Sequence, residues 1–166
     1  MRPLSTKMDD PILVLTLVAA LGCGLVSGIF FAFSTFIMKA LARLAPAHGI
    51  AAMQAINVDV LNRWFFTVFF GTALCCVALA VSSILRWHRT DAVYLLVGSV
   101  LYLVGTILVT SIFNVPLNNK LAAVDPMTTE ASRLWIEYVK SWTAWNHVRT
   151  TTALLAAASF SVALCR

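Results

Sequence analysis

The chain has 166 residues, of which 60% are hydrophobic and only 11% are charged, and its mean hydropathy is +0.87. Soluble domains usually carry about 25% charged residues, so this composition excludes an ordinary soluble globule and indicates an integral membrane protein. The formal net charge of +5 is spread over segment ends without a basic run, which favours contact with lipid headgroups over nucleic-acid binding. The apolar runs do not alternate as barrel strands do, so we expect an all-α fold.

Four apolar segments are long enough, or nearly so, to cross a bilayer as helices, which requires about 20 residues. The predicted spans lie at about residues 11–38, 64–85, 92–113 and 146–165. The short connection at 86–91 makes the second and third spans antiparallel neighbours. We therefore predict one domain over residues 1–166, an antiparallel transmembrane four-helix bundle with both termini on the same side.

The connection between the first two spans carries an amphipathic pattern. Ile50, Met53, Asn57 and Val60 recur at helical spacing up to Trp64, which predicts a helix that leads into the second span. Asn57 interrupts the apolar stripe of this helix, so we expect its side chain to face the protein interior.

The third span ends in the sequence FNVPLNN, which contains Asn114, Asn118 and Asn119. Pro116 lacks the N–H that a helix ladder needs and restrains the residue before it. We therefore expect the helix to stop at Pro116 and a polar connection to run from there to residue 127.

Residues 130–165 contain neither glycine nor proline and predict one long last helix. About 35 residues at 1.5 Å each give roughly 50 Å, so its first part must project beyond a hydrocarbon core of about 30 Å. One face of this helix is aromatic and basic, and Asn146 flanks it. The face consists of Trp135, Tyr138, Trp142, Trp145, Arg149 and Thr152.

The topology brings the polar residues of the first connection, the third connection and the start of the last span to one end of the bundle. Arg149 would lie at the membrane boundary, where an arginine is costly unless it is paired or faces a wet cavity. We therefore predict a polar and aromatic binding site at this end. An interfacial aromatic belt, with Arg149 reaching to the headgroups, is the alternative.

Histidine placement limits the possible metal sites. His88 lies on the opposite side from His48 and His147, which excludes a three-histidine site in one chain. His48 and His147 with a nearby carboxylate remain open as metal ligands. We expect no cofactor, and a metal is not excluded.

Four motifs resemble those of the anthrone oxygenase family of small four-span membrane proteins. They are MQAIN (53–57), FFGT (69–72), NVPLNN (114–119) and WNHVRT (145–150). Characterised members of that family oxidise anthrones to anthraquinones with neither flavin nor haem, and many bacterial members have no assigned activity. The resemblance implies a cofactor-independent monooxygenase of a small aromatic or phenolic hydrophobic substrate in a bacterial cytoplasmic (inner) membrane.

An anthrone site requires a base, a partner for the substrate anion and flat surfaces for stacking. We assign the base to His147 and the anion partner to Arg149. The predicted substrate-binding residues are Asn57, Asn114, Asn118, Asn119, Trp142, Trp145 and Asn146. Two other functions remain open: a non-enzymatic membrane subunit that docks a partner through the Trp135–Tyr138 face, and a binder or carrier of hydrophobic small molecules.

Orientation follows from the basic residues. Lys and Arg are denser in the termini and the 86–91 turn than in the two long connections, although the long connections hold more of them in total. Positive charge in short loops marks the cytoplasmic side, so we place both termini in the cytoplasm. The expected partners are the lipid bilayer and a small aromatic ligand, with no nucleic acid, and the sequence does not fix the oligomeric state.

Overall fold

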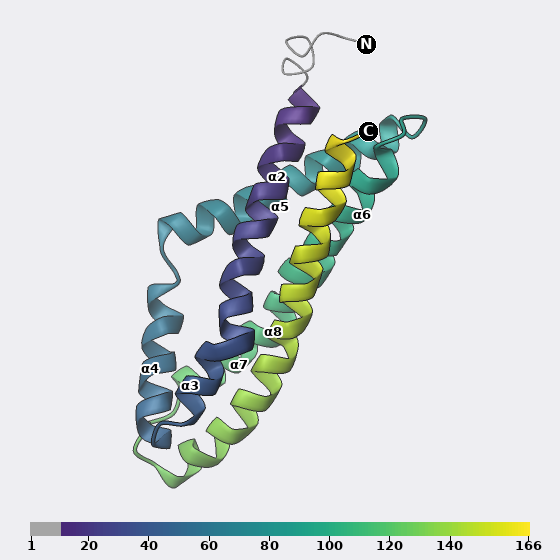
Figure 1. Cartoon of the computed structure of the whole chain (residues 1–166). Coiled ribbons are helices and arrows are strands. Elements are labelled where there is room, and N and C mark those ends of the chain that lie inside the picture. Colours follow the sequence, from purple (N-terminus) through teal and green to yellow (C-terminus); the bar gives the residue numbers. More distant parts are fainter. Residues whose placement is uncertain (1–10) are drawn as a thin grey trace.

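A computed structural model describes residues 11–166, and most of them are helical. The chain passes along the bundle four times in alternating directions, so the start of α2 and the end of α8 lie at the same end (Figure 1). The all-α antiparallel bundle is therefore confirmed. The first ten residues, two of which enter the orientation argument, lie outside the described residues.

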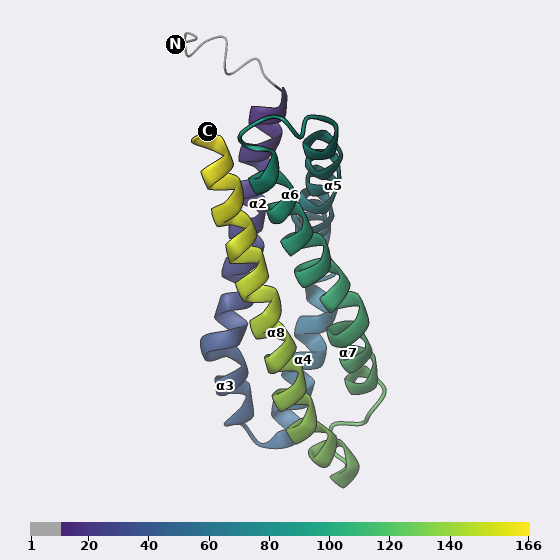
Figure 2. The same cartoon turned by 90° about the vertical axis from the view of Figure 1, so that its right-hand side faces the viewer.

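The four passes differ in length and regularity. The first pass consists of α2 (Pro11–Ala32), the π-helical turn η1 (Phe33–Ile37) and α3 (Met38–Ala42), and the chain then returns through α4 (Pro46–Asp59) and α5 (Arg63–Leu85). The third pass consists of α6 (Ala92–Tyr102), the π-helical turns η2 (Leu103–Leu108) and η3 (Thr110–Asn114), and α7 (Val115–Ala122). The last pass is α8 (Thr129–Leu164). Figure 2 shows α8 lying along the full length of the bundle.

Three helices in the described part of the chain are long and apolar enough to cross a membrane. They cover Pro11–Ala42, Arg63–Leu85 and Ala92–Ala122. The predicted fourth span, within α8, does not reach the same apolarity, because Arg149 and the three threonines after it interrupt its apolar sequence. Its crossing of the membrane therefore stays a prediction.

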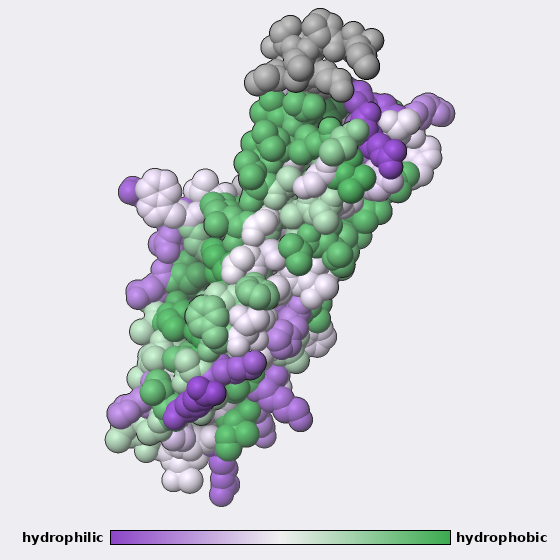
Figure 3. Space-filling model, viewed as in Figure 1, coloured by the Kyte–Doolittle hydropathy of each residue, from purple (hydrophilic) through white to green (hydrophobic). Residues whose placement is uncertain are grey.

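The outer surface of the bundle is apolar over much of its length. Large side chains such as Leu21 on α2 and Leu74 on α5 are 66% and 71% exposed. In Figure 3 hydrophobic residues dominate the upper part of the molecule, and hydrophilic residues are more frequent in the lower part. Such a surface is expected where lipid, not water, surrounds the helices.

Two buried clusters fill the bundle, and α8 contributes to both. The first lies between α2, α5, α6 and α8, with Phe69, Tyr102 and Phe160 at its centre. The second lies below it, between α3, α4, α7 and α8, and includes Trp135 and Tyr138. The long α8 therefore packs in both buried clusters and connects the two ends of the bundle.

The prediction that the third span stops at Pro116 is wrong. The helix continues from η3 through Pro116 to Ala122, and only 123–128 form the connection. A proline ring usually clashes with the carbonyl four residues earlier, here that of Ile112. The wider π-helical turn of η3 ends just before Val115 and makes room for the ring, so the helix continues.

The predicted helix in the first connection exists, but it does not run unbroken into the second span. α4 ends at Asp59, and the Asn62 side chain caps α5 by accepting hydrogen bonds from the backbone N–H groups of Trp64 and Phe65, both at 3.0 Å. Such a cap starts a new helix in a new direction, because the capping residue itself is extended. The first part of α5 accordingly leans away from α2 (Figure 1).

The predicted last helix is confirmed as one element of 36 residues, Thr129–Leu164. The Thr128 hydroxyl caps its start by accepting a hydrogen bond from the backbone N–H of Ala131 at 3.1 Å. The predicted aromatic and basic face of this helix points into the bundle, not to the membrane interface, since Trp135, Tyr138 and Trp142 are 5% exposed or less.

Candidate functional site

Arg149 is the buried cation at the centre of the candidate site. Its side chain is 4% exposed, and its guanidinium lies 4.2 Å from the ring centre of Phe30 and 5.0 Å from that of Trp142. Its Nη2 donates to Asn146 Oδ1 at 2.7 Å, and its Nη1 donates to the Thr110 hydroxyl at 3.3 Å. Arg149 therefore faces the protein interior and does not reach to the headgroups.

Asn146 fixes the position of Arg149 by binding three neighbours at once. Its Nδ2 donates to the Phe30 carbonyl at 2.7 Å and to Ser34 Oγ at 2.8 Å, while its Oδ1 accepts from Arg149. All of the hydrogen-bonding capacity of this fully buried amide except one acceptor lone pair is thus used inside the protein.

A second polar cluster lies one turn further along the same face of α8. Asn118 Oδ1 accepts hydrogen bonds from the Tyr138 hydroxyl at 2.9 Å and from Trp142 Nε1 at 2.8 Å. Burial raises the pKa of the Tyr138 phenol above its usual range, so the hydroxyl stays protonated and donates. This cluster fixes α7 against α8 and orients Trp142 toward Arg149.

These residues surround a cavity of about 110 Å³. Aromatic and aliphatic side chains from α2, η1, the α4–α5 link and α5 form most of its wall. Asn57 adds a polar side chain from α4, and Thr110, Asn118 and Arg149 add theirs from η3, α7 and α8. The full lining is Ile29, Phe30, Phe33, Ile56, Asn57, Val60, Leu61, Phe65, Thr110, Val115, Asn118, Trp142 and Arg149.

Two of the polar side chains in this wall have a buried nitrogen without a hydrogen-bond partner. They are Arg149 Nε and Asn57 Nδ2. Asn57 lies beside the Tyr138 hydroxyl, but no hydrogen bond of acceptable geometry reaches its Nδ2. Leaving a buried donor without an acceptor costs about 1–3 kcal/mol, and more where it is charged. Both side chains line the cavity, so a small turn of either one toward the cavity would let a ligand oxygen accept from its free donor.

The cavity lining contains no carboxylate, and the one side-chain ion pair found within residues 11–166 joins Arg89 to Asp91 at the other end of the molecule. The positive charge of Arg149 is thus balanced only by an amide, a hydroxyl and two aromatic rings. An anion in the cavity would face an uncompensated cation in a region of low dielectric constant.

The structure brings some of the predicted binding residues to this cavity and leaves others outside it. Asn57, Asn118 and Trp142 line it. Asn114 is buried behind it and donates to the Trp142 carbonyl at 3.2 Å. Trp145 instead stacks on Phe113, with ring centres 3.6 Å apart.

The two predicted catalytic residues are not brought together. His147 is exposed and lines a different pocket, on the other side of α8 from Arg149. Asn119 is also exposed and does not line the cavity. Their assignment as base and as substrate ligand stays a prediction that the geometry of the cavity does not support.

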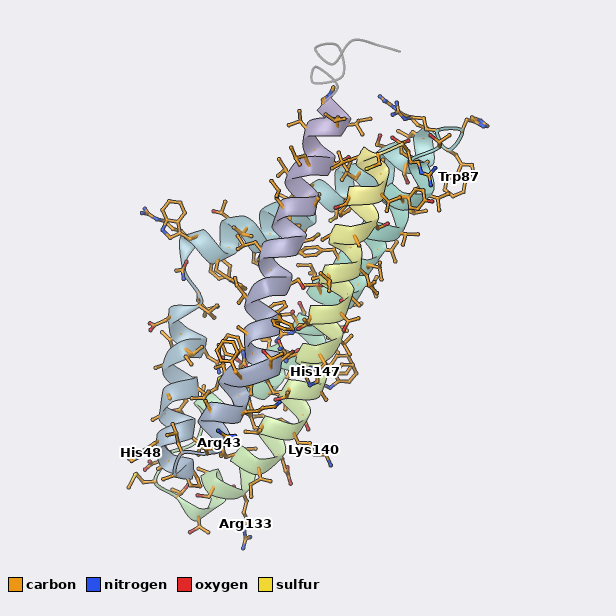
Figure 4. The ribbon with its side chains drawn as sticks, viewed as in Figure 1. Arg43, His48, Trp87, Arg133, Lys140 and His147 are labelled. Carbon is orange, nitrogen blue, oxygen red and sulfur yellow. The ribbon has the colours of Figure 1, made fainter. Side chains whose placement is uncertain are left out.

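The candidate metal ligands also lie apart. His48 is on α4 near the lower end of the bundle, and His147 is on α8 well above it (Figure 4). Within residues 11–166 no group of three or more His, Cys, Asp or Glu side chains is placed to hold a metal ion. The structure therefore does not bring His48 and His147 together with a carboxylate as ligands of one metal ion.

Sequence reasoning missed three residues that shape the site. Phe30 supplies the ring nearest to Arg149, Thr110 supplies a hydroxyl to it, and Phe65 closes the wall from α5. Phe30 and Phe65 sit in apolar runs that give no reason to prefer one phenylalanine over its neighbours. Thr110, three residues from the start of the FNVPLNN motif, is the only one with a polar signal.

Comparison with known proteins gives one result. Searches with the whole chain find no matching curated protein and no matching solved structure. Residues 64–159 match the family described as anthrone oxygenase, and this segment contains Thr110, Asn118, Trp142 and Arg149. Because the match covers more than half of the 166 residues, the chain belongs to the anthrone oxygenase family.

Proposed function

We propose that the protein is an oxygenase that oxidises a flat phenolic substrate of the anthrone type, bound in the cavity with an anionic oxygen against Arg149. The observation that carries this proposal is a buried guanidinium that no carboxylate balances and whose Nε points to no acceptor. The enolate oxygen of a deprotonated anthrone supplies both the missing charge and the missing acceptor.

The reaction needs no group beyond the substrate anion and oxygen for its electrons and atoms to balance. Loss of one proton from the methylene carbon of an anthrone gives an anion delocalised onto the ketone oxygen. Its electrons reduce O₂, and a carbon–oxygen bond forms at that carbon. The outer oxygen takes up a proton to give a hydroperoxide, and loss of the second methylene hydrogen with that OH group, as water, leaves the second carbonyl of the quinone. Anthrone and O₂ thus give anthraquinone and water.

The residues of the cavity would promote the first step by stabilising the anion. Arg149 lowers the free energy of the enolate relative to the neutral ketone, because it interacts with charge that is present only after deprotonation. Phe30 and Trp142 offer faces against which an aromatic ring can pack. No histidine or carboxylate lines the cavity, so water or hydroxide accepts the proton in this proposal.

The size of the cavity limits what it can hold without movement. An engineered protein cavity of about 150 Å³ binds benzene, and the cavity here has about 110 Å³. A three-ring substrate therefore requires the wall to open. The short link between α4 and α5, which contributes Val60 and Leu61 to the wall, is the place where two helices can separate without unfolding.

The alternative function is a subunit that docks a partner through the Trp135–Tyr138 face, but this face is not exposed for docking. The two side chains are 3% and 1% exposed and pack inside the second buried cluster. A carrier of hydrophobic molecules uses the same cavity and differs from an oxygenase only in turnover.

The test measures quinone formation and oxygen uptake from anthrone with protein purified in detergent. We expect the protein to exceed the protein-free rate, and Arg149→Lys to lower the excess by roughly tenfold or more, because lysine lacks the planar fork that contacts an oxygen and Asn146 together. Arg133→Lys, an exposed change on the same helix, should have no effect. Quenching of tryptophan fluorescence by anthrone without oxygen measures binding separately. Binding without any quinone above the protein-free rate would make the protein a carrier and refute the proposal.

A further inference from the structure

A second, larger pocket lies on the opposite face of α8 from the Arg149 cavity. It is an open groove of about 350 Å³ between the first pass of the chain and α8. Lys140, Thr143 and His147 line it at helical spacing, whereas Trp142 and Arg149 project from the other side of the helix. Figure 4 shows Lys140 and His147 on the same side of α8.

The polar lining of this pocket is cationic. Lys39 from α3 faces the pocket together with Lys140 and His147, and no carboxylate lines it. Within residues 11–166 neither lysine has a carboxylate within ion-pair distance, since the one side-chain ion pair there is between Arg89 and Asp91. The pocket therefore favours an anion.

Two hydroxyls add hydrogen-bonding capacity to the same pocket. Thr143 Oγ1 is buried and has no hydrogen-bond partner. Ser34 Oγ is already engaged, because it accepts from Asn146 Nδ2 at 2.8 Å and shares a hydrogen bond with the Thr150 hydroxyl at 3.1 Å. Thr143 is thus the lining hydroxyl without a partner, and a turn of its side chain toward the pocket would let it donate to an oxygen ligand.

The depth of the pocket indicates the source of that anion. With Pro11 at one membrane surface, Lys39 lies about 42 Å along the helix, and a bilayer including its headgroups is about 40–45 Å thick. Counted back from Leu164, His147 lies about 26 Å and Lys140 about 36 Å along α8. The pocket thus extends from within the hydrocarbon, at His147, through its edge, near Lys140, to the headgroup layer, at Lys39. Met38 and Val139 give it an apolar side.

We propose that this pocket binds the phosphate group of an anionic phospholipid. Lys39 and Lys140 contact the phosphate oxygens, Thr143 donates a hydrogen bond, and an acyl chain lies against the apolar side. Phosphate chemistry is shared by lipid headgroups and by free phosphate, and the membrane depth of the pocket favours the lipid.

The test measures lipids retained by the detergent-purified protein, counted by native mass spectrometry. Dioleoylphosphatidylglycerol and dioleoylphosphatidylcholine are supplied at equal mole fraction, with and without millimolar inorganic phosphate. We expect the wild type to prefer the anionic lipid at least about fivefold. The double variant Lys39→Gln, Lys140→Gln should lose this preference. The matched control, Lys120→Gln with Arg133→Gln, removes the same charge from exposed positions outside the pocket and should keep it.

Thr143→Val tests the hydroxyl without changing the charge, and it should lower the preference about two- to fivefold. Equal loss in the pocket and control variants would show general electrostatic attraction and overturn the proposal. Displacement of the lipid by inorganic phosphate would overturn the lipid assignment. An unchanged preference in the pocket variant would overturn the site, provided that its circular dichroism matches that of the wild type.

Discussion

Removing Asn146 should destabilise the protein far more than removing Arg149, although both side chains are buried. Asn146→Leu takes from the guanidinium its shortest hydrogen bond, the 2.7 Å contact with Nη2, and leaves the Phe30 carbonyl and Ser34 Oγ without the Asn146 donor. Each buried group left without a hydrogen-bond partner costs about 1–3 kcal/mol, and more where it is charged, so the three losses together cost at least about 3–5 kcal/mol.

Arg149→Met should change stability much less. It forfeits a charge-assisted hydrogen bond of about 1.5–3 kcal/mol and cation–π contacts of about 2 kcal/mol. It also removes a desolvation penalty of several kcal/mol per buried ion, and the methionine side chain still packs against Phe30 and Trp142. We expect a net change within about 2 kcal/mol, and the double variant should be more stable than Asn146→Leu alone.

The assay is the thermal midpoint in one detergent, followed by near-ultraviolet circular dichroism. For a chain of this length 1 kcal/mol corresponds to about 2–4 °C, so Asn146→Leu should lower the midpoint by roughly 6–20 °C and Arg149→Met by less than about 8 °C. The cycle of the two single variants and the double variant isolates their interaction. If the effects of the two substitutions are additive, or if Arg149→Met is as damaging as Asn146→Leu, Arg149 is a structural residue and the reasoning fails.

Two further predictions concern packing and charge. Gly105→Val should lower the thermal midpoint, because a Cβ there would lie within 2.6 Å of three Thr152 side-chain atoms and such overpacking typically costs about 1–3 kcal/mol. The control is Gly24→Val, where a Cβ meets nothing within 4 Å, and it should leave the midpoint unchanged. Equal effects of the two substitutions would contradict the close approach of Gly105 to Thr152. Asp91 accepts two hydrogen bonds from Arg89, at 3.0 and 2.9 Å, which hold the pKa of its carboxyl below the usual range. Asp91→Asn should therefore lower the thermal midpoint at pH 7. The decrease should be a few degrees at most, because the arginine is half exposed. This contribution is present above the usual aspartate pKa and is lost as the pH falls through the lowered folded-state value, so melting curves of variant and wild type should converge in acid; a difference that persists there would refute the linkage.

The sequence was sufficient to predict the bundle and the buried face of α8. Apolar length and the absence of glycine and proline in 130–165 define helices by local rules. The spacings of three, four and seven residues between Trp135, Tyr138, Trp142 and Arg149 define one face. The helical periodicity of these residues was therefore enough to predict that they share one buried face. The contacts of Phe30 with Arg149 and Asn146 depend on the register between the first and last helices, which no local pattern encodes.

One assignment that the cavity does not support, that of His147, and one error, the helix end at Pro116, have physical causes that the sequence contained in part. His147 and Arg149 are two residues apart on a helix, which separates them by about 200° and keeps them from sharing one cavity. This separation could be predicted from the two-residue spacing in the sequence. The passage of the helix through Pro116 could not be predicted, because it depends on the π-helical turn of η3, whose extra residue per turn has no distinct sequence signature.

The cavity wall divides along the boundary of the family match. Arg149, Thr110, Asn118 and Trp142 lie inside the matched segment, whereas Phe30 and most of the apolar wall, including residues 29–33 and 56–61, lie outside it. In the proposed function, contacts to the anion therefore come mainly from the matched segment, and most of the apolar wall comes from the chain before it. Substitutions in the first pass and the α4–α5 link would therefore change the shape of the cavity while leaving the Arg149 side chain in place.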